Sequence, residues 1–399
     1  MVKFAHVSDT HLGKRNFKLK EREDDFDRAF SEFVDKCIEE KVDFVIHSGD
    51  LFDIPKPRIN IIVNVIKELK RLKQNNIPVY IIAGSHDMGI DGTLITALEN
   101  VELLENIGAN RHYEHKDDKI ILHGRIHKDF FIAGVPGRRA NIEEIFSRIT
   151  PEKTNAKWKI FMFHHSITDV SPSFGEIPTS LLPKGFDYYA GGHWHFKSEM
   201  EYNKKPLIYP GPTEYCDSSE MEREGERGFY IIEEKNSVLV PRFVKLNTRN
   251  VVFVHIDCGG LSPQEIVEKC TKEIKDDNKN SILIVKLSGR LREGKRVDID
   301  RNEIYDFASE KNYLYAKINM SDLMDPFDKT GVDITGKNIE EIEHEFLKQK
   351  GYSDSLIIFA KELVSVLGRD GETAEAELNT QEIIKKLEED YIETEENKA

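Results

Sequence analysis

The chain has 399 residues, of which 39% are hydrophobic and 32% charged, and it carries a net charge of −15. This composition excludes a mainly disordered or collagen-like chain, and the length predicts two or three domains. No apolar run approaches the ~18–20 residues of a membrane span, and the N-terminal run has no signal-peptide cleavage site. The four cysteines are scattered without CxxC spacing, which indicates a reducing compartment and argues against a disulfide scaffold or a thiolate zinc site.

The negative charge is concentrated at the end of the chain. Residues 321–399 hold 9 basic and 21 acidic side chains, whereas the first 320 residues hold 48 basic and 51 acidic ones. The total charge speaks against a nucleic-acid partner, but the nearly neutral part of the chain can still carry a local basic groove.

The first two hundred residues alternate between short apolar runs and stretches with helical periodicity. The predicted strands are 2–9, 42–50, 78–87, 158–165, 186–195 and 206–212. The predicted helices are 24–40, 59–74 and 93–108. This alternation is typical of an α/β fold in which helices cover the faces of the sheets.

A smaller unit follows the first domain, which we assign to residues 1–227. The segments RGFYIIEE and SVLVPRFVKL predict a hairpin that closes the first domain. A β-α-β-α-β order follows in the second domain, to which we assign residues 228–320. Residues 321–337 read as a linker. Helical periodicity returns in 338–399, which ends in an acidic tail. These helices either pack on the parent domain or form a tethered module that binds a partner, and composition alone favours neither alternative.

Five of the predicted strands end in residues of the types that bind metals. In chain order they are Asp9 and His11, Asp50, Ser85 with His86 and Asp87, His164, and His193 with His195. Ligands of α/β sheets bind outside the carboxyl ends of the strands, so these five sets are expected to converge on one rim. A single such histidine is more often a satisfied polar group, but five strand ends in one chain argue against coincidence.

The donors on this rim are carboxylates and imidazoles, without a thiolate. Such a set suits Mn²⁺, Fe²⁺ or Zn²⁺ rather than Ca²⁺. There are too many candidates for one tetrahedral ion, and one carboxylate can bridge two ions ~3.5–4 Å apart. The residues therefore predict a two-metal centre.

The motifs on this rim resemble those of the calcineurin-like metallophosphoesterases. They are DTH (9–11), GDLFD (49–53), GSHD (84–87), FHH (163–165) and GHWH (192–195). With YPGPTEY (209–215), the length and the small second domain, they are similar to the double-strand-break repair nucleases of the Mre-eleven/SbcD type, most of all the archaeal ones. The resemblance implies a β-sheet sandwich flanked by helices, a small α/β capping domain and a C-terminal helical segment that binds an ATPase partner.

The resemblance also implies a ligand set for two Mn²⁺ ions per subunit, with Mg²⁺, Fe²⁺ or Zn²⁺ as other choices. The first ion takes Asp9, His11 and His195, and the second takes His164 and His193. Asp50 bridges the two ions.

Three residues of the GSHD segment have separate implied roles. His86 faces the scissile phosphate as an acid or a charge stabiliser, and Asp87 orients it by accepting its other ring proton. Ser85 stands where the family usually has a metal-binding Asn, so the second site is expected to be weaker.

The implied activity is that of a 3′→5′ exonuclease and single-strand endonuclease in double-strand-break repair. The implied protein is a homodimer that works with a coiled-coil ABC-type ATPase, is cytoplasmic and nucleoid-associated, and has no membrane contact. The candidates for DNA contacts are basic residues just past the ligands, namely Lys14, Arg15, Lys56 and Arg58. The alternative is a phosphatase or cyclic-nucleotide phosphodiesterase on the same metal centre.

Overall fold

The computed structural model describes residues 2–326, except 90–91, 138–140, 173–174, 224 and 278, together with 344, 347–348, 352–354, 356–358 and 360–361. The chain divides into two compact units. The first comprises Met1–Asp257, Ile266–Ser288 and Asp300–Asp322, and the second comprises Cys258–Glu265, Gly289–Ile299 and Leu323–Ala399. Within the described ranges, no helix combines the length and apolar character needed to cross a membrane.

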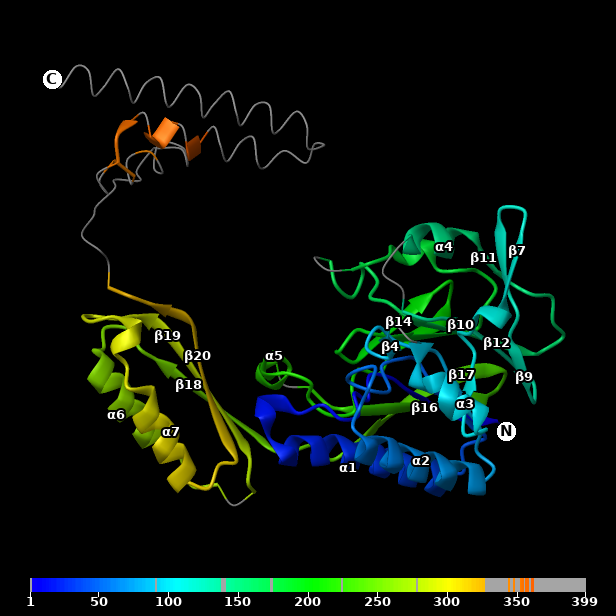
Figure 1. The fold of residues 1–399 in the computed structure, drawn as a ribbon, viewed down its shortest axis with the longest axis horizontal. Coiled ribbons are helices and arrows are strands. Elements are labelled where there is room, and N and C mark those ends of the chain that lie inside the picture. The colour runs from blue at the N-terminus through cyan, green and yellow to red at the C-terminus, as the bar shows by residue number, and fades with distance from the viewer. Residues whose placement is uncertain are drawn as a thin grey trace. The chain divides into compact units, whose positions relative to one another are not determined.

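Two six-stranded sheets form the centre of the first unit (Figure 1). The strands of the first sheet, in spatial order, are β17 (Val238–Lys245), β16 (Gly228–Lys235), β1 (Lys3–Val7), β2 (Phe44–His47), β3 (Val79–Ile81) and β6 (Glu105–Asn106). Those of the second are β14 (Ser198–Tyr202), β15 (Lys205–Tyr209), β13 (Tyr188–Gly192), β12 (Trp158–His164), β10 (Phe130–Val135) and β9 (Arg125–His127).

Alternating side chains of these strands fill different cores. Phe4 of β1 points between the sheets, where its ring centroid lies 5.5 Å from that of Phe130 and 5.4 Å from that of Tyr188. Its neighbour Ala5 points the other way, into a core shared with the helices that cover the first sheet. This period of two follows from the pleat of a strand and produces the predicted sandwich flanked by helices.

Helices cover the outer face of the first sheet, and a smaller layer covers the second. The first layer contains α1 (Lys20–Glu39), α2 (Ile59–Gln74) and α3 (Leu94–Asn100). The second contains α4 (Ile142–Arg148) and a sheet of β7 (Tyr113–Lys116), β8 (Lys119–Leu122) and β11 (Ile149–Pro151). The short remaining elements of this part are η1 (Asn16–Lys18), β4 (Met88–Gly89), β5 (Gly92–Thr93), η2 (Asn110–His112), η3 (Thr179–Leu181) and α5 (Ser218–Glu222).

The parallel strands of each sheet end level with one another. In the first sheet Val7 pairs with His47, and His47 pairs with Ile81. In the second sheet His164 pairs with Gly192 across β12 and β13. The loops that leave these carboxyl ends carry the predicted ligands, so both sheets contribute to one rim.

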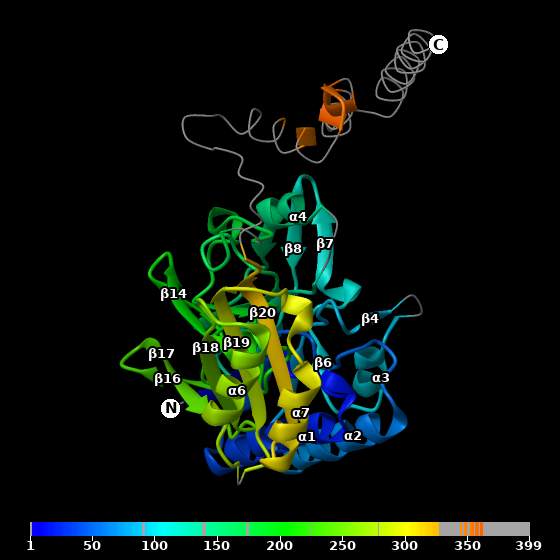
Figure 2. The same cartoon turned by 90° about the vertical axis from the view of Figure 1, so that its left-hand side faces the viewer.

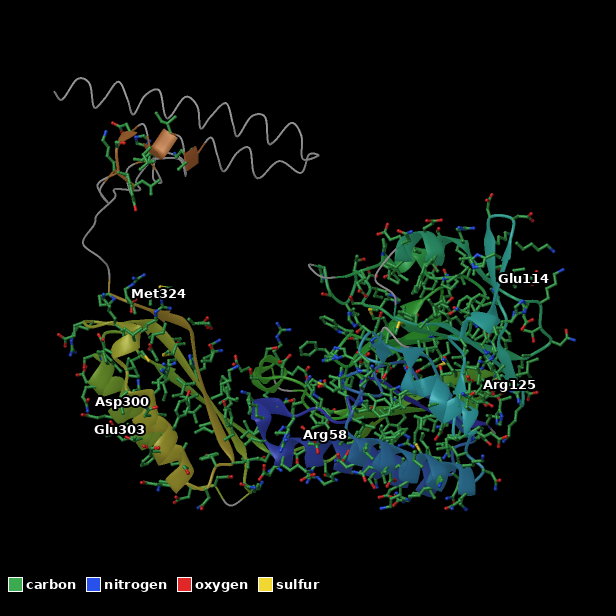
Figure 3. All side chains as sticks on the ribbon, viewed as in Figure 1. Arg58, Glu114, Arg125, Asp300, Glu303 and Met324 are labelled. Atoms are coloured by element: carbon green, nitrogen blue, oxygen red, sulfur yellow. The ribbon has the colours of Figure 1, made fainter. Side chains whose placement is uncertain are left out.

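The remaining elements follow the expected β-α-β-α-β order. They are β18 (Val251–Asp257), α6 (Pro263–Glu273), β19 (Ile282–Arg290), η4 (Arg296–Asp298), α7 (Arg301–Glu310) and β20 (Tyr315–Met324), with α6 and α7 side by side on one face of the sheet (Figure 2). Asp300 begins α7 by accepting hydrogen bonds from the backbone amides of Asn302 and Glu303 (Figure 3). Since β20 continues to Met324, it enters the segment expected to be a linker. Most of the predicted helices in 338–399 lie outside the described residues.

Candidate metal centre

Four of the predicted ligands have a left-handed backbone. The φ angle is 53° at Asp9, 42° at His11, 56° at Asp50 and 79° at His193. Residues other than glycine rarely adopt a positive φ, and such strain concentrates at functional sites. Gly84 permits the close approach of two of these loops, because a Cβ atom there would lie 2.1 Å from Asp50 Oδ1.

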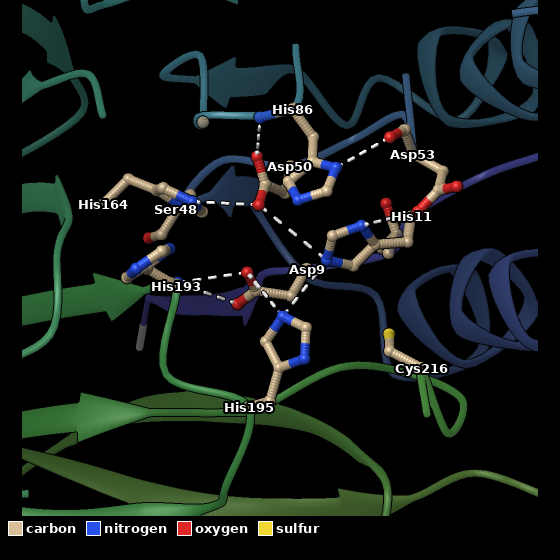
Figure 4. Close-up of polar contacts among 12 residues, drawn as sticks. Asp9, His11, Ser48, Asp50, Asp53, His86, His164, His193, His195 and Cys216 are labelled. Carbon is tan, nitrogen blue, oxygen red and sulfur yellow. Dashed lines mark hydrogen bonds and ion pairs between the residues drawn. The ribbon is translucent and has the colours of Figure 1, made fainter. Parts of the chain in front are cut away.

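Asp9, His11 and His195 form the first group of predicted ligands (Figure 4). The Nε2 atoms of His11 and His195 lie 3.2 Å apart, and His195 Nε2 lies 3.8 Å from Asp9 Oδ1. Asp9 is fully buried, and both its oxygens accept a hydrogen bond from the backbone amide of His193, at 3.0 and 3.1 Å. Two imidazole nitrogens that face each other beside a buried carboxylate are a donor set that fits a divalent cation.

Asp50 lies between this group and a second one formed with His164 and His193. Its Oδ2 is 3.1 Å from His164 Nε2 and 3.8 Å from His11 Nε2. Candidate ligand atoms of Asp50, His164 and His193 lie within 4.8 Å of one another, as do those of Asp9, His11 and Asp50. Asp50 therefore occupies the position that a bridging carboxylate requires.

Asp50 and His164 form a buried, strongly coupled pair. Burial opposes charge on both groups, but their attraction raises the pKa of His164 to about 10 and holds the pKa of Asp50 far below its usual range. His164 Nδ1 donates a hydrogen bond to the backbone carbonyl of Ser48 at 2.7 Å, which aims Nε2 at Asp50. Because a histidine ligand must be unprotonated, a cation that binds at Nε2 displaces this proton.

The prediction that Asp87 accepts a ring proton of His86 is wrong. His86 Nδ1 instead donates a hydrogen bond to the backbone carbonyl of Asp53 at 2.7 Å, and the exposed ring lies 4.9 Å from that of His11, centroid to centroid. Asp87 is buried, and its carboxylate accepts hydrogen bonds of 2.8, 2.9 and 3.2 Å from the backbone amides of Gly84, Phe52 and Leu51. Asp87 thus joins two ligand-bearing loops and places His86 only through the backbone.

Comparison with known proteins identifies the family. The family model described as calcineurin-like phosphoesterase matches residues 2–197. The DNA double-strand break repair protein Mre11 of Saccharolobus solfataricus is 33% identical over 286 residues, which cover 69% of this chain and 68% of the relative. The chain belongs to the Mre11 family. The Mre11 protein of Sulfolobus acidocaldarius extends the similarity over 94% of this chain and 97% of its own length, at 28% identity.

Membership of the Mre11 family confirms the resemblance seen in the motifs. The chain is a metal-dependent hydrolase with the calcineurin-like phosphoesterase fold, a fold family that uses two metal ions. The side chains that could hold these ions are the ones that the strand ends bring together.

Two acidic side chains face the Nδ1 atoms of two candidate ligands, His195 and His11. His195 Nδ1 lies 2.7 Å from Glu220 Oε1, and Glu220, on α5, is 2% exposed. Asp53 Oδ1 lies 3.4 Å from His11 Nδ1 and 2.8 Å from Lys14 Nζ. No motif marks Glu220, because its short helix reaches the site only through the fold. Asp53 does carry a sequence signal, because it is the second aspartate of the GDLFD motif.

Replacing Glu220 by glutamine is expected to weaken Mn²⁺ binding by roughly 10–100-fold. The neutral amide can still accept a hydrogen bond, but it no longer increases the basicity of His195. Calorimetric titration of the full chain with Mn²⁺ measures the change. Glu226→Gln is the matched control, since Glu226 is exposed and pairs with Lys197. Equal Mn²⁺ affinities for Glu220→Gln and the parent chain would contradict the supporting role.

His6 of β1 and His47 of β2 are core groups rather than ligands. His6 is fully buried between Tyr188 Oη at 2.9 Å and Ser48 Oγ at 3.0 Å, and His47 lies 3.1 Å from Thr10 Oγ1. Burial lowers the pKa of His6 to about 3 and that of His47 to about 4, so both rings are neutral near pH 7.

Proposed function

We propose that this chain is a two-metal DNA nuclease, a 3′→5′ exonuclease and single-strand endonuclease that processes the ends of double-strand breaks. The observation that carries the proposal is the position of Asp50 between two histidine groups, with the exposed ring of His86 beside them. Relatives that are 33% identical to this chain over 286 and 303 aligned residues are named as double-strand break repair proteins, which supports DNA as the substrate.

The ligand assignment follows the two groups. Asp9, His11 and His195 would hold one ion, His164 and His193 the other, and Asp50 would bridge them. When bound, two Mn²⁺ ions would neutralise the phosphodiester and make hydroxide available near pH 7. The chain's own part is to hold these donors at fixed positions, which the buried contacts of Asp9 and His164 achieve.

His86 would act on the leaving group. The backbone carbonyl of Asp53 accepts a hydrogen bond from Nδ1 and fixes the orientation of the ring. Nε2 is therefore the atom that can donate a proton to the departing sugar oxygen. An alkoxide is a poor leaving group, and its protonation removes the developing charge.

Substituting Ser85 by asparagine is expected to tighten binding of the second Mn²⁺ ion. Ser85 is half-buried between Gly84 and His86, and a hydroxyl is a poorer ligand than an amide carbonyl. We expect a gain of about tenfold for the weaker of the two binding steps in a calorimetric titration. Thr93→Asn would control for a general effect of the added amide. Unchanged affinity in Ser85→Asn would exclude Ser85 as the weak point of the second site.

The DNA contacts and partners belong to the same proposal. Among the four candidate cations, Lys14 pairs with Asp53 and Arg58 pairs with Glu23. Arg15, Lys56 and Arg58 are exposed, and we propose all four cations as phosphate contacts.

We also propose a homodimer, for which α2 offers exposed apolar side chains, and a coiled-coil ABC-type ATPase that binds 338–399. The domains proposed from the sequence are 1–227, 228–320, 321–337 and 338–399, with the first boundary moved beyond Lys245 because β16 and β17 pair with β1 in the first sheet. The proposed location is the cytoplasmic nucleoid.

A nuclease assay tests the proposal. End-labelled linear duplex DNA is incubated with the parent chain and Mn²⁺, Mg²⁺ or EDTA. We expect shortening from the 3′ end with Mn²⁺ and no cleavage with EDTA. If the metal-loaded protein hydrolyses a small phosphodiester but leaves DNA intact, the proposed nuclease activity is wrong and the chain acts as a phosphatase or cyclic-nucleotide phosphodiesterase.

A further inference from the structure

A thiol lies beside the first group of ligands. A ring nitrogen of His11, a ring nitrogen of His195 and the Sγ atom of Cys216 all lie within 4.8 Å of one another. Figure 4 shows the sulfur on the side of Cys216 that faces the two rings. Cys216 is 4% exposed and lies in the segment between β15 and α5. Because it does not directly follow a strand, the strand-end motifs do not include it.

The backbone of Cys216 is fixed on both sides. Its amide donates a hydrogen bond to Glu220 Oε2 at 2.9 Å, and its carbonyl accepts one from Asn16 Nδ2, also at 2.9 Å. Glu220 thus holds both His195, through Oε1, and Cys216, through Oε2. One buried carboxylate therefore positions two of the three donor groups relative to each other.

His11 supplies a further observation. Its ring is 1% exposed, and Nδ1 faces Asp53 Oδ1 at 3.4 Å, so Nε2 is the nitrogen turned toward His195, whose Nε2 lies 3.2 Å away. Two imidazole nitrogens at this distance either share one proton or bind a common cation. A cation in place of that proton would be held by both rings beside the thiol.

We propose that Cys216 is an additional ligand of the first ion and makes that position selective for thiophilic divalent cations such as Zn²⁺, Co²⁺ and Cd²⁺ over Mn²⁺. The inference rests on the proposed two-metal centre. Bonds of about 2.3 Å to sulfur and 2.0–2.1 Å to nitrogen put these donors roughly 3.5 Å apart, so ligation requires only a small closure of the side chains. When the sulfur–metal bond forms, the thiol proton passes to solvent water.

The consequence is that the two metal positions differ in chemistry. The first offers two imidazoles, carboxylate oxygen and sulfur, and the second offers imidazoles and oxygen. Soft donors favour Zn²⁺ and related ions, whereas oxygen donors suit Mn²⁺. The expectation from the cysteine spacing that no thiolate binds metal would then be wrong, because Cys216 acts with histidines rather than with a second cysteine.

Absorption spectroscopy of the full chain titrated with Co²⁺ tests the proposal. A thiolate ligand gives a sulfur-to-cobalt charge-transfer band in the near ultraviolet. We expect this band in the parent chain and in the control Cys37→Ala, whose sulfur is buried in the core under α1. We expect its loss in Cys216→Ala and Cys216→Ser, with a Cd²⁺ affinity at least about tenfold lower and a smaller change in Mn²⁺ affinity. Thermal unfolding of all variants verifies that they fold.

Two outcomes would overturn the proposal, and they differ in what they leave standing. If Co²⁺ binds without the band, or the band persists in both Cys216 variants, Cys216 is not a ligand and the metal centre itself is unaffected. If no Co²⁺ binds and the parent chain also fails to cleave DNA with Mn²⁺, the metal centre is wrong as well.

Discussion

Replacement of His86 by alanine is expected to reduce DNA cleavage by about 10²–10⁴-fold while leaving binding of Mn²⁺ and DNA intact. His86 is exposed at the rim, and its only described polar contact through Nδ1 is the carbonyl of Asp53, so its removal leaves the ligand loops in place. The buried carboxylate of Asp87, which does join those loops, is untouched by this change. Single-turnover cleavage of end-labelled duplex DNA measures the rate.

The matched control for this variant is His115→Ala, an exposed histidine on β7 away from the rim. Equilibrium dialysis with Mn²⁺ and fluorescence anisotropy with labelled DNA report the two binding steps. A variant that loses Mn²⁺ together with activity would show that His86 is a ligand, and a variant that cleaves at the parent rate would remove it from the chemistry.

Asp50→Asn is expected to abolish cleavage and to lower Mn²⁺ affinity at both positions by more than about 100-fold. The amide has the shape of the carboxylate but carries no charge, and a neutral oxygen cannot neutralise two cations at once. The backbone tolerates the change, since asparagine also adopts a positive φ. Equilibrium dialysis should therefore recover two ions per chain from the parent and fewer than one from the variant.

Asp117→Asn provides the control for Asp50→Asn. Asp117 also has a positive φ, 51°, but lies exposed in the turn between β7 and β8. If Asp50→Asn kept one tightly bound ion, Asp50 would serve a single position and would not bridge.

The order of strands and helices could be predicted from the sequence, because the buried strands are short runs of apolar residues and the helices are strongly amphipathic. The prediction of 59–74 coincides with α2. The predicted helix 93–108 is too long, because α3 ends at Asn100, Glu102 turns with φ 56° and β6 then joins the first sheet. A strand pairing overrides the helical period there. The sequence prediction also missed β10, a fully buried strand next to the edge strand β9, whose carboxyl end carries no metal-binding residue.

The grouping of the candidate ligands was predictable because each follows a strand end, and parallel strands bring such ends together. Their supporting contacts were not predictable. His195 meets Glu220 across 25 positions of the chain, and His86 is held by a carbonyl, which any residue at position 53 would supply. Asp87 was misassigned because adjacency in the chain suggested a contact that the backbone geometry does not make.

The predicted ligands come from both sheets of the sandwich. Asp9, His11 and Asp50 leave strands of the first sheet, whereas His164, His193 and His195 leave strands of the second. Cations bound among them would fasten the two sheets at their common edge, and the sheets could not part without releasing them. Ligand binding to the folded state alone stabilises it by RT ln(1 + [L]/Kd), about 2.7 kcal/mol per site at a hundredfold excess over Kd. The unfolding temperature of the sandwich would thus rise with the concentration of free metal. A chelator would lower the stability of the fold as well as abolish catalysis.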